Sequence, residues 1–568
     1  MKKSISLLLI LCLILSLFSG CSAHKGSFTY YLKNSVRSLD PQTANGTYAE
    51  TVINALFDGL CRIDENGEAV PAVAESWTAN SSNTVFTFTI DPEAKWSNGE
   101  PVTAYDFVYG IQRALSPSTE AENVDDLFVI SGARDAYYGI ADVSSVGVSA
   151  TNDTTLVFTL ERSCPNFPKL TAGIRYMPCN QEFFKSTTGR YGLGSSYLIT
   201  NGPFTFSSSY AWTDGVSIEL SAYDNYNGKV KPASLTFYLG ESDDITEDPV
   251  SALTNGTTDI LELDNATQVS DAEAAGCTVS TFTNKTTGIL FNTESDNLST
   301  RLREIFVKSI DRDALSQALS EGEELADDII PSGLTYNGDD YRSNAESSLF
   351  VKQDTAVYDY QNYKSSVSGE IVSNDNTTEQ TENGDESSYT IIDNTSDSLE
   401  TTQTSASDEY LEESQDEEID SIPSITIICR DDYQSTAIAN SIISNWNKFD
   451  SCYCNIKPLS EDDFETAIYN KDYDVALYTI ESSSDTALSM LQCFESTASP
   501  QLLDSVSFDT LMHSGGGDIS DITNLEKFLN NQFIFYPICY SSSYYASAPS
   551  VKNVLVNIGT VDFTKATK

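Results

Sequence analysis

Histidine is nearly absent from this sequence, which limits the chemistry that the chain can perform. Its two histidines are His24 and His513, so neither a Ser-His-Asp triad nor a metal site built from several histidines is expected. The residues after His513 read Ser-Gly-Gly-Gly, as in some oxyanion-hole loops, but no Gly-x-Ser-x-Gly sequence occurs in the chain. We therefore predict a flexible loop at His513, no catalytic residue, no metal and no cofactor, in a protein that is not an enzyme.

The 11 cysteines are the other reactive side chains, and nine of them follow Cys21. They are scattered without Cys-x-x-Cys pairs at zinc spacing, and Cys452 and Cys454 are the closest two along the chain. An odd number of cysteines cannot all pair with one another. We expect mainly buried free thiols, with one or two disulfides left open for an exported protein.

Acidic residues dominate the charge of the chain. It has 83 Asp and Glu against 32 Lys and Arg, a formal net charge of −51. Such a surface repels phosphate backbones, so we expect no nucleic-acid partner. It is also repelled by anionic lipid, so attachment to a membrane requires a covalent anchor.

The first residues supply a candidate for that anchor. After two lysines, an apolar run extends from Ile5 to Phe18, shorter than the roughly 20 residues of a membrane-spanning helix. This pattern is typical of a secretion signal, here residues 1–20. Small residues directly before Cys21 are typical of a bacterial lipoprotein signal. We predict lipidation of Cys21, a polar tether over 21–27, and a lipid-anchored protein on the extracytoplasmic face of the cell membrane.

Both kinds of secondary structure are expected in the chain. Apolar residues recur at every second position in Val85–Ile90 and Thr155–Leu160, which predicts strands. Helices are predicted over Ala104–Leu115, where Thr103 precedes the first turn as a capping residue, and over Leu302–Leu319. The predicted class is therefore α/β, mixed with α+β.

The composition changes abruptly over residues 365–421. Between Glu370 and Asp420 there are 17 acidic residues and no Lys or Arg. Such a segment cannot bury enough apolar surface to offset the entropy of ordering, so we predict a disordered insertion. A calcium-binding segment or an interaction tail is the alternative, but the regular Asp-x-Asp-x-Asp-Gly spacing of a calcium loop is missing.

Short motifs follow one another along the rest of the chain. Leu39–Pro41 reads Leu-Asp-Pro, Pro71–Trp77 reads Pro-Ala-Val-Ala-Glu-Ser-Trp, and Lys95–Phe107 reads Lys-Trp-Ser-Asn-Gly-Glu-Pro-Val-Thr-Ala-Tyr-Asp-Phe. Thr200–Phe204 reads Thr-Asn-Gly-Pro-Phe. In type and order these motifs resemble those of the family 5 bacterial solute-binding proteins, which include oligopeptide and dipeptide receptors of ABC importers.

The resemblance implies a two-lobed periplasmic-binding-protein-like fold with an extra domain in the first lobe. It assigns residues 28–71, 201–286 and 538–568 to lobe 1, 72–200 to the extra domain, and 287–537 to lobe 2, which contains the acidic insertion. It also implies a monomer that captures oligopeptides in the cleft between the lobes and delivers them to a membrane permease with its ATPase subunits.

The resemblance also suggests ligand contacts by position. In peptide-binding members an extended ligand pairs with backbone from both lobes, as an added strand. The corresponding contacts are Asn45, Gly46 and Thr47 in the first lobe, and Tyr478 and Thr479 in the second.

The ligand's amino terminus is expected at an acid. Peptide-binding members carry an Asp in a Trp-x-x-Asp pattern, where this chain reads Tyr-Thr-Ile-Glu. Glu481 is the first candidate to bind the ammonium group and Asp485 the second, the alternative being that Glu481 is an ordinary surface acid. A non-peptide solute, either an oligosaccharide or a metal chelate, and a peptide-pheromone receptor for signalling remain open.

Overall fold

A computed structural model describes residues 25–568 except 241–242, 296, 337–338, 350–351, 369–423, 483, 497 and 515–518. The predicted signal peptide, Cys21 and most of the acidic insertion lie outside the described residues. Among the helices that the structure describes, none combines the length and the apolar composition needed to cross a membrane.

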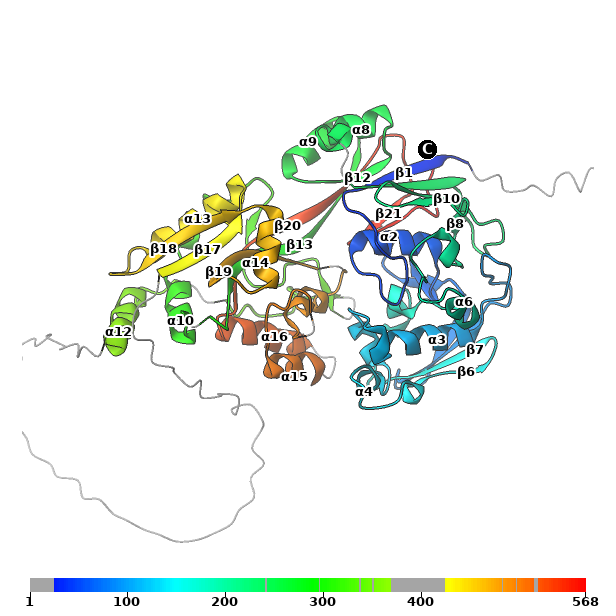
Figure 1. The fold of residues 1–568 in the computed structure, drawn as a ribbon, viewed down its shortest axis with the longest axis horizontal. Coiled ribbons are helices and arrows are strands. Elements are labelled where there is room, and N and C mark those ends of the chain that lie inside the picture. The colour runs from blue at the N-terminus through cyan, green and yellow to red at the C-terminus, as the bar shows by residue number, and fades with distance from the viewer. Residues whose placement is uncertain are drawn as a thin grey trace, which may run out of the picture.

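One mixed sheet of 12 described strands runs through both lobes, which confirms the α/β class (Figure 1). We call the part from β12 to β8 the first lobe and the part from β18 to β19 the second lobe. The first-lobe strands are β1 (Ser27–Leu32), β8 (Phe204–Phe206), β9 (Trp212–Thr213), β10 (Ser217–Ala222), β11 (Ser234–Leu239) and β12 (Ile260–Leu263). Those of the second lobe are β14 (Glu324–Leu325), β17 (Ser424–Arg430), β18 (Tyr453–Leu459) and β19 (Val475–Glu481).

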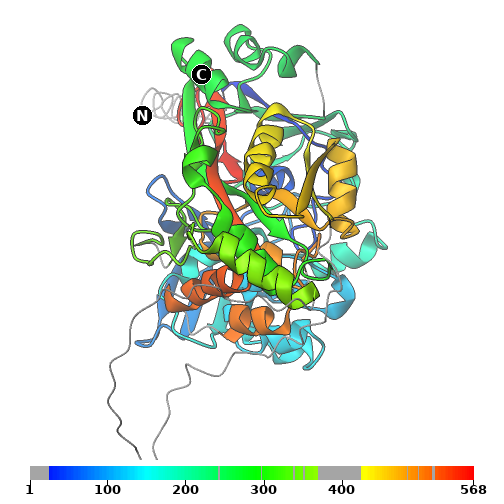
Figure 2. The same cartoon turned by 90° about the vertical axis from the view of Figure 1, so that its left-hand side faces the viewer.

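Two long antiparallel strands, β13 (Thr278–Phe291) and β20 (Phe535–Ser547), belong to both lobes. Figure 2 shows them side by side along their length. β20 pairs with β12 at its first-lobe end, and β13 pairs with β19 from Lys285 onward. Between these regions the described sheet is only two strands wide. The predicted boundaries after residues 286 and 537 fall inside these strands, and the domain ranges remain predictions.

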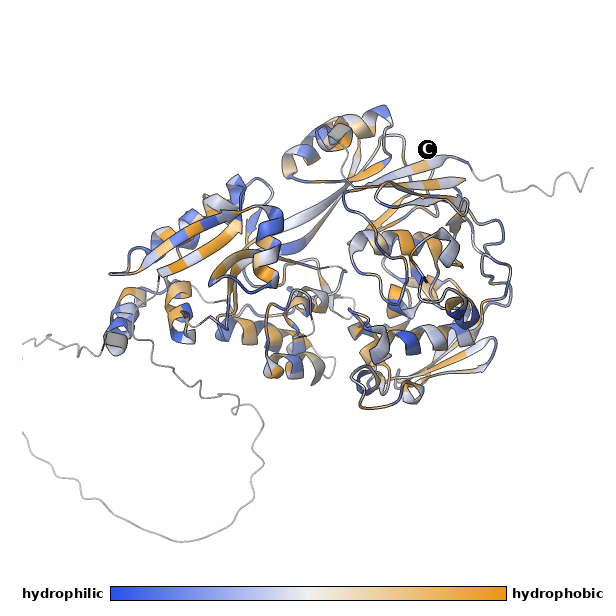
Figure 3. Ribbon diagram, viewed as in Figure 1, coloured by the Kyte–Doolittle hydropathy of each residue, from blue (hydrophilic) through white to orange (hydrophobic). Residues whose placement is uncertain are grey.

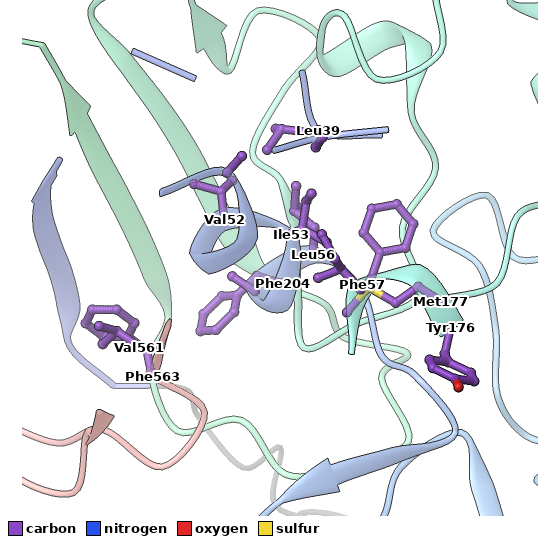
Figure 4. Close-up of a cluster of buried hydrophobic side chains, with 14 of the residues drawn as sticks. Leu39, Val52, Ile53, Leu56, Phe57, Tyr176, Met177, Phe204, Val561 and Phe563 are labelled. Atoms are coloured by element: carbon purple, nitrogen blue, oxygen red, sulfur yellow. The ribbon is translucent and has the colours of Figure 1, made fainter. Parts of the chain in front are cut away.

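Apolar side chains of helix α2 (Thr47–Leu56) form the centre of the first lobe. Val52, Ile53 and Leu56 are fully buried, and Figure 4 shows Phe204 beside their helix, with Phe563 from the C-terminal segment farther to the left. The segment returns to this lobe as the hairpin β21 (Leu555–Asn557) and β22 (Thr560–Asp562). The other described helices of the lobe are α7 (Asp243–Thr246), α8 (Pro249–Asn255) and α9 (Ala266–Ala274).

A separate four-stranded antiparallel sheet lies within residues 74–159, and we call it, with its helices, the extra domain. Its strands are β4 (Ala74–Ala79), β5 (Val85–Ile90), β6 (Val148–Asn152) and β7 (Thr155–Thr159), and its helices are α3 (Ala104–Ala114), α4 (Ala133–Tyr137), α5 (Phe167–Leu170) and α6 (Gln181–Ser186). Both strands predicted here are confirmed. The predicted helix start is also confirmed, because Thr103 and Asp106 form a capping box at α3. A two-stranded hairpin, β2 (Cys61–Ile63) with β3 (Ala69–Pro71), precedes it.

Helices cover the sheet of the second lobe, whose strand β17 is largely hydrophobic (Figure 3). They are α10 (Thr300–Ser309), α11 (Arg312–Ser316), α12 (Ala356–Ser368), α13 (Tyr433–Trp446), α14 (Glu461–Tyr469), α15 (Val506–Ser514) and α16 (Ile519–Asn531). A short hairpin joins β15 (Thr335–Tyr336) to β16 (Asp339–Asp340).

Three predictions for this lobe are wrong. The single helix over Leu302–Leu319 is two helices, because Ile310 is extended and the Asp311 side chain accepts from Ala314 N, capping a new helix. His513 lies in the last turn of α15 rather than in a loop. Residues 365–368 belong to α12, not to the insertion.

A buried ion pair joins the extra domain to the first lobe. Arg113, in the last turn of α3, donates to both carboxylate oxygens of Asp40 and to Gln42 Oε1. The side chains of Arg113 and Asp40 are only 8% and 6% exposed. The guanidinium also lies 4.3 Å from the ring centroid of Phe184. The Leu-Asp-Pro motif therefore has a structural role in holding two parts of the fold together.

We expect Asp40→Ala to lower the free energy of unfolding by about 3–5 kcal/mol, because it leaves the buried Arg113 charge without its carboxylate. Urea unfolding of the protein starting at residue 22 measures this. Glu65→Ala is the control, because Glu65 pairs with Lys565 at the surface, where both side chains are about two-thirds exposed. Equal stabilities of the two variants would contradict the role assigned to Asp40.

Candidate functional site

A cavity of about 240 Å³ lies where the extra domain and first lobe face the second lobe. Its walls come from opposite sides of the molecule, and most of their residues are in loops or short 3₁₀ turns. On the first-lobe and extra-domain side they are Asn45, Glu122, Asn123, Val124, Phe128, Tyr137 and Tyr138. On the second-lobe side they are Glu481, Ser489, Gln492, Cys493, Glu495, Ala498 and Ser499. Of the predicted contact residues, the structure thus brings Asn45 and Glu481 together at one cavity.

Arg175 holds the loop that presents Asn45. Its side chain is buried and donates to the carbonyls of Pro41 (2.8 Å) and Ala44 (2.9 Å), and to Asn45 Oδ1 (2.8 Å). It also donates to the backbone carbonyl of Glu122 at 3.0 Å. Four oxygens therefore surround the buried guanidinium and rigidify this wall of the cavity. The Asn45 amide in turn donates to the Glu122 carboxylate.

Gly46 and Thr47 do not line the cavity but begin helix α2 beside it. Gly46 has φ +92°, a conformation that a side-chain-bearing residue rarely adopts, and open space surrounds the position of a Cβ. Backbone conformation, not close packing, therefore explains glycine here. Thr47 is the first residue of the helix.

Tyr478 and Thr479 lie on β19, also outside the cavity lining. The Thr479 hydroxyl is 2.7 Å from that of Thr287 on β13, and the Tyr478 ring stacks on Phe464 with centroids 6.3 Å apart. β17 pairs with β19 only at Val475 and Ala476. In the part of the sheet that the structure describes, the outer edge of β19 beyond Ala476 therefore has no strand beside it.

Glu481, at the end of β19, already has partners. Its carboxylate lies 3.6 Å from Lys285 Nζ and accepts from Asn284 Nδ2 and Ser543 Oγ, both at 3.3 Å. Its side chain is still 46% exposed. Glu481 is therefore accessible to a ligand, which would share the carboxylate with Lys285.

Asp485, the second candidate acid, is exposed but is not part of the cavity lining. Its backbone carbonyl accepts from Thr335 N at 2.6 Å. The charge of Asp485 acts across the lobes on Asp126, in the 3₁₀ turn η2 (Asp125–Val129). Desolvation raises the pKa of Asp126, and the Asp485 carboxylate raises it further.

Asn284 connects the elements around Glu481. It lies at a register shift between β13 and β20 and is 1% exposed. Its amide donates to Ser482 O (3.2 Å) and accepts from Ser543 N (3.2 Å). One buried side chain therefore links the end of β19 to the crossing strand β20, at the place where the sheet is two strands wide.

Sequence reasoning missed most of the cavity lining. Glu122, Gln492 and Glu495 lie in turns without hydrophobic periodicity, and none of them belongs to the motifs described above. Only tertiary structure brings these segments together, so no pattern within either segment indicates the site.

A match to a sequence model supports the assignment of a family. The model for "Bacterial extracellular solute-binding proteins, family 5 Middle" matches residues 68–500. A curated relative, the oligopeptide-binding protein OppA of Bacillus subtilis (strain 168), is 30% identical over 361 residues, which cover 57% of this chain and 62% of the relative. The chain thus spans about three fifths of the length of that relative.

Solved structures agree in fold. The substrate-binding domain of an oligopeptide ABC transporter from Bacillus anthracis superposes with a TM-score of 0.70 at 22% identity, covering 96% of this chain and 99% of that domain. The pheromone receptor PrgZ, in a structure describing its mode of peptide binding, gives a TM-score of 0.70 at 20% identity, covering 95% and 99%. At these identities the likeness concerns the fold, and it confirms the predicted two-lobed architecture.

The electrostatics beside the cavity predict a pH dependence of stability. Burial raises the pKa of Glu50, in the first turn of α2, to about 7, with Arg175 opposing the shift and Asp126 adding to it. An acid whose pKa is higher in the folded state binds its proton more tightly there. The contribution of Glu50 to the stability of the folded protein is therefore fully present at pH values below its unfolded pKa, near 4.5. It is lost as the pH rises through the folded pKa, about 7.

We expect Glu50→Gln to abolish this dependence. The free energy of unfolding of the wild type should fall relative to that of the variant between about pH 4.5 and 7, and the difference should be constant outside that range. Unfolding curves across pH measure it, with Glu93→Gln reporting the effect of removing an exposed charge. A constant difference across the whole range would contradict the raised pKa.

Proposed function

We propose a peptide-binding role for this chain, which belongs to family 5 of the bacterial extracellular solute-binding proteins. In this proposal it captures oligopeptides between its two lobes and delivers them to the permease and ATPase subunits of an ABC importer. The observation that carries the proposal is the outer edge of β19, which no strand among the described residues pairs beyond Ala476, next to an interlobe cavity.

An extended peptide is a ligand that such an edge suits. Backbone N–H and C=O groups that no strand pairs can bind the main chain of a peptide as an added strand. Tyr478 and Thr479 provide this edge in the second lobe, while Asn45, Gly46 and Thr47 are the first-lobe contacts. Since main-chain pairing does not depend on side chains, peptides of different sequence would share one binding mode.

Closure of the lobes would complete the site. The cavity walls belong to different lobes, which are connected by the two-stranded part of β13 and β20. A rotation there moves the walls toward each other around a ligand, as in hinge-bending proteins. A ligand that contacts both walls stabilises the closed form by its preference for that form over the open one.

Glu481 is the group that we assign to the ligand's ammonium. It is exposed at the end of the free edge and lines the cavity. Lys285, at 3.6 Å, competes with the ammonium for the same carboxylate. Removal of that lysine is therefore expected to strengthen binding, and removal of Glu481 to weaken it.

The remaining assignments extend this proposal. We assign the chain to the extracytoplasmic face of the membrane, held by a lipid on Cys21, and expect a monomer without enzymatic activity. Cys21 lies outside the described residues. A peptide-pheromone receptor is the second candidate function, favoured by the likeness in fold to PrgZ; an adjacent permease and ATPase gene would favour import.

We expect peptides with a free amino terminus to raise the melting temperature of the protein starting at residue 22. A ligand at 100 times its dissociation constant adds about 2.7 kcal/mol to the free energy of unfolding. Acetylated peptides and the variant Glu481→Gln should give smaller shifts, whereas Lys285→Met should give larger ones. Asp485→Asn tests the second candidate acid.

A set of oligosaccharides measured in parallel provides the comparison. Melting-temperature shifts with sugars alone, or with neither class, would remove the peptide assignment and leave the family and the fold. Equal shifts for free and acetylated peptides would keep peptide binding but reject the role of Glu481.

A further inference from the structure

We propose that Cys452 and Cys454 form a disulfide bond in the second lobe, at the turn that leads into β18. This inference goes beyond the proposed function and does not depend on the ligand, since neither residue lines the interlobe cavity. It is carried by the contact between the two sulfur atoms, by the backbone around them, and by a helix that covers them.

The two thiols are already in contact. Their sulfur atoms lie 3.5 Å apart, and the residues are only 5% and 4% exposed. Because a disulfide bond is about 2.05 Å long, the sulfur atoms must approach one another by about 1.5 Å. Rotation of one side chain from one staggered position to the next moves its sulfur atom by more than this distance. A side-chain movement within the turn is therefore sufficient to form the bond.

The backbone of the turn permits this movement at Cys452. Two residues apart in a strand, Cα atoms are about 6.6 Å apart, which is close to the upper limit of roughly 6.8 Å across a disulfide. Cys452 lies just before β18, and φ of Ser451 is +64°, so the chain turns directly ahead of the pair. The backbone N–H of Cys452 donates to Phe449 O at 3.2 Å. Cys452 therefore belongs to a turn, where its Cα can come closer to that of Cys454 than the spacing of a strand allows.

Cys454 is held more firmly. The side chain of Asn447, directly after α13, accepts from Cys454 N at 2.8 Å and donates to Cys454 O at 3.1 Å. Cys454 also pairs with Ile425 of β17. One cysteine therefore has a fixed backbone and the other has a backbone that can adapt. This difference suits the closure of a small ring that leaves the sheet undisturbed.

The contact between the thiols also makes them unequal. The Cys454 thiol donates to Cys452 and lowers the pKa of Cys452 more than burial raises it, while the same contact raises the pKa of Cys454. Burial instead raises the pKa of the Cys429 thiol, in the same lobe, to about 11. A thiolate is the attacking species in disulfide exchange. Cys452 is therefore the attacking residue of the pair.

Helix α12 covers the pair through Tyr360. The Tyr360 ring stacks on Phe449 with centroids 4.5 Å apart, and the residue is 1% exposed. Its hydroxyl has no hydrogen-bond partner among the described residues, yet it lies close enough to lower the pKa of Cys452 further. Lys364, one turn along the helix, pairs with Asp450. The packed helix thus shields a bond between the two sulfur atoms from reductants in solution.

The bond is expected to form during folding, before α12 packs over the turn. The contact between the thiols is local, because only one residue separates the two cysteines. It can therefore arise before the rest of the lobe is assembled. The family to which the chain belongs is extracellular, and disulfides form and persist in such an environment.

The oxidant is another disulfide, of a protein or a small molecule. The Cys452 thiolate attacks one of its sulfur atoms, the external S–S bond breaks, and one half leaves as a thiolate. Cys454 then loses its proton to water and attacks Cys452 Sγ, which expels the second half. The protein loses two protons and two electrons and gains one S–S bond, and the external disulfide is reduced to two thiols.

Mass spectrometry after oxidative refolding tests this inference. The ring closes over only three residues, so the bond should change the global stability little, and a melting temperature would not report it. The protein starting at residue 22 is reduced, unfolded and refolded in reduced and oxidised glutathione, and the remaining thiols are blocked with iodoacetamide. The tryptic peptide Phe449–Lys471 contains Cys452, Cys454 and no other cysteine, since trypsin does not cleave between Lys457 and Pro458. We expect most of this peptide to carry no blocking group and to be lighter by two hydrogens.

Variants then assign the order of attack. Cys454→Ser should trap a mixed disulfide between Cys452 and glutathione, because no second thiol is present to displace the glutathione. Cys277→Ser is the matched control, since Cys277 is a buried cysteine at the start of β13, outside the second-lobe core that contains the pair. In this control the bond between Cys452 and Cys454 should form as in the wild type.

Two results would overturn the inference. Blocking groups on both cysteines of the wild-type peptide, or a bond from either of them to another cysteine, would show that the pair does not close. An unmodified Cys452 in Cys454→Ser would reject Cys452 as the attacking thiolate. Neither result bears on the proposed binding of peptides.

Discussion

The lobes of this protein depend on the pairing of two strands. β13 and β20 pair with each other and pass from one lobe into the other. The first lobe adds its strand β12 beside β20, and the second lobe adds its strand β19 beside β13. Between these additions the connection consists of main-chain hydrogen bonds and the buried amide of Asn284. The position of the cavity follows from this arrangement, because Glu481 ends β19 beside the same amide.

Charge is distributed unequally between the interior and the cavity. Although acids outnumber bases by 83 to 32, several arginines are buried in structural contacts. Arg113 holds Asp40, Arg175 holds the Asn45 loop, and Arg342 pairs with Glu526, a side chain that is 1% exposed. Buried guanidinium groups are stable only with several acceptors around them. Among the described residues that line the cavity, the charged ones are the acids Glu122, Glu481 and Glu495.

The fold could be predicted from the sequence because its motifs act locally. Thr103 and Asp106 cap α3, and alternating side chains define β5 and β7 whatever the rest of the chain does. The break between α10 and α11 was missed, because apolar periodicity continues on both sides of the capping residue Asp311. Asn45 and Glu481 were predicted as ligand contacts of the two lobes only through the family resemblance. Glu122 and Glu495 could not, since their proximity exists only in the folded chain.

The narrow connection between the lobes also determines how much binding free energy a ligand needs to close them. Around Asn284 the crossing strands carry short hydroxyl side chains, Thr283 opposite Ser542 among them, with oxygens 3.1 Å apart. A connection of two strands has no further strand to rearrange when it twists, so its open and closed forms are expected to differ little in internal energy. When two forms are nearly balanced, a few kcal/mol of preference is sufficient to reverse their populations. A few contacts from a small ligand would then change the relative position of the lobes and so the shape of the outer surface. A membrane partner can recognise from that shape that the cavity is filled.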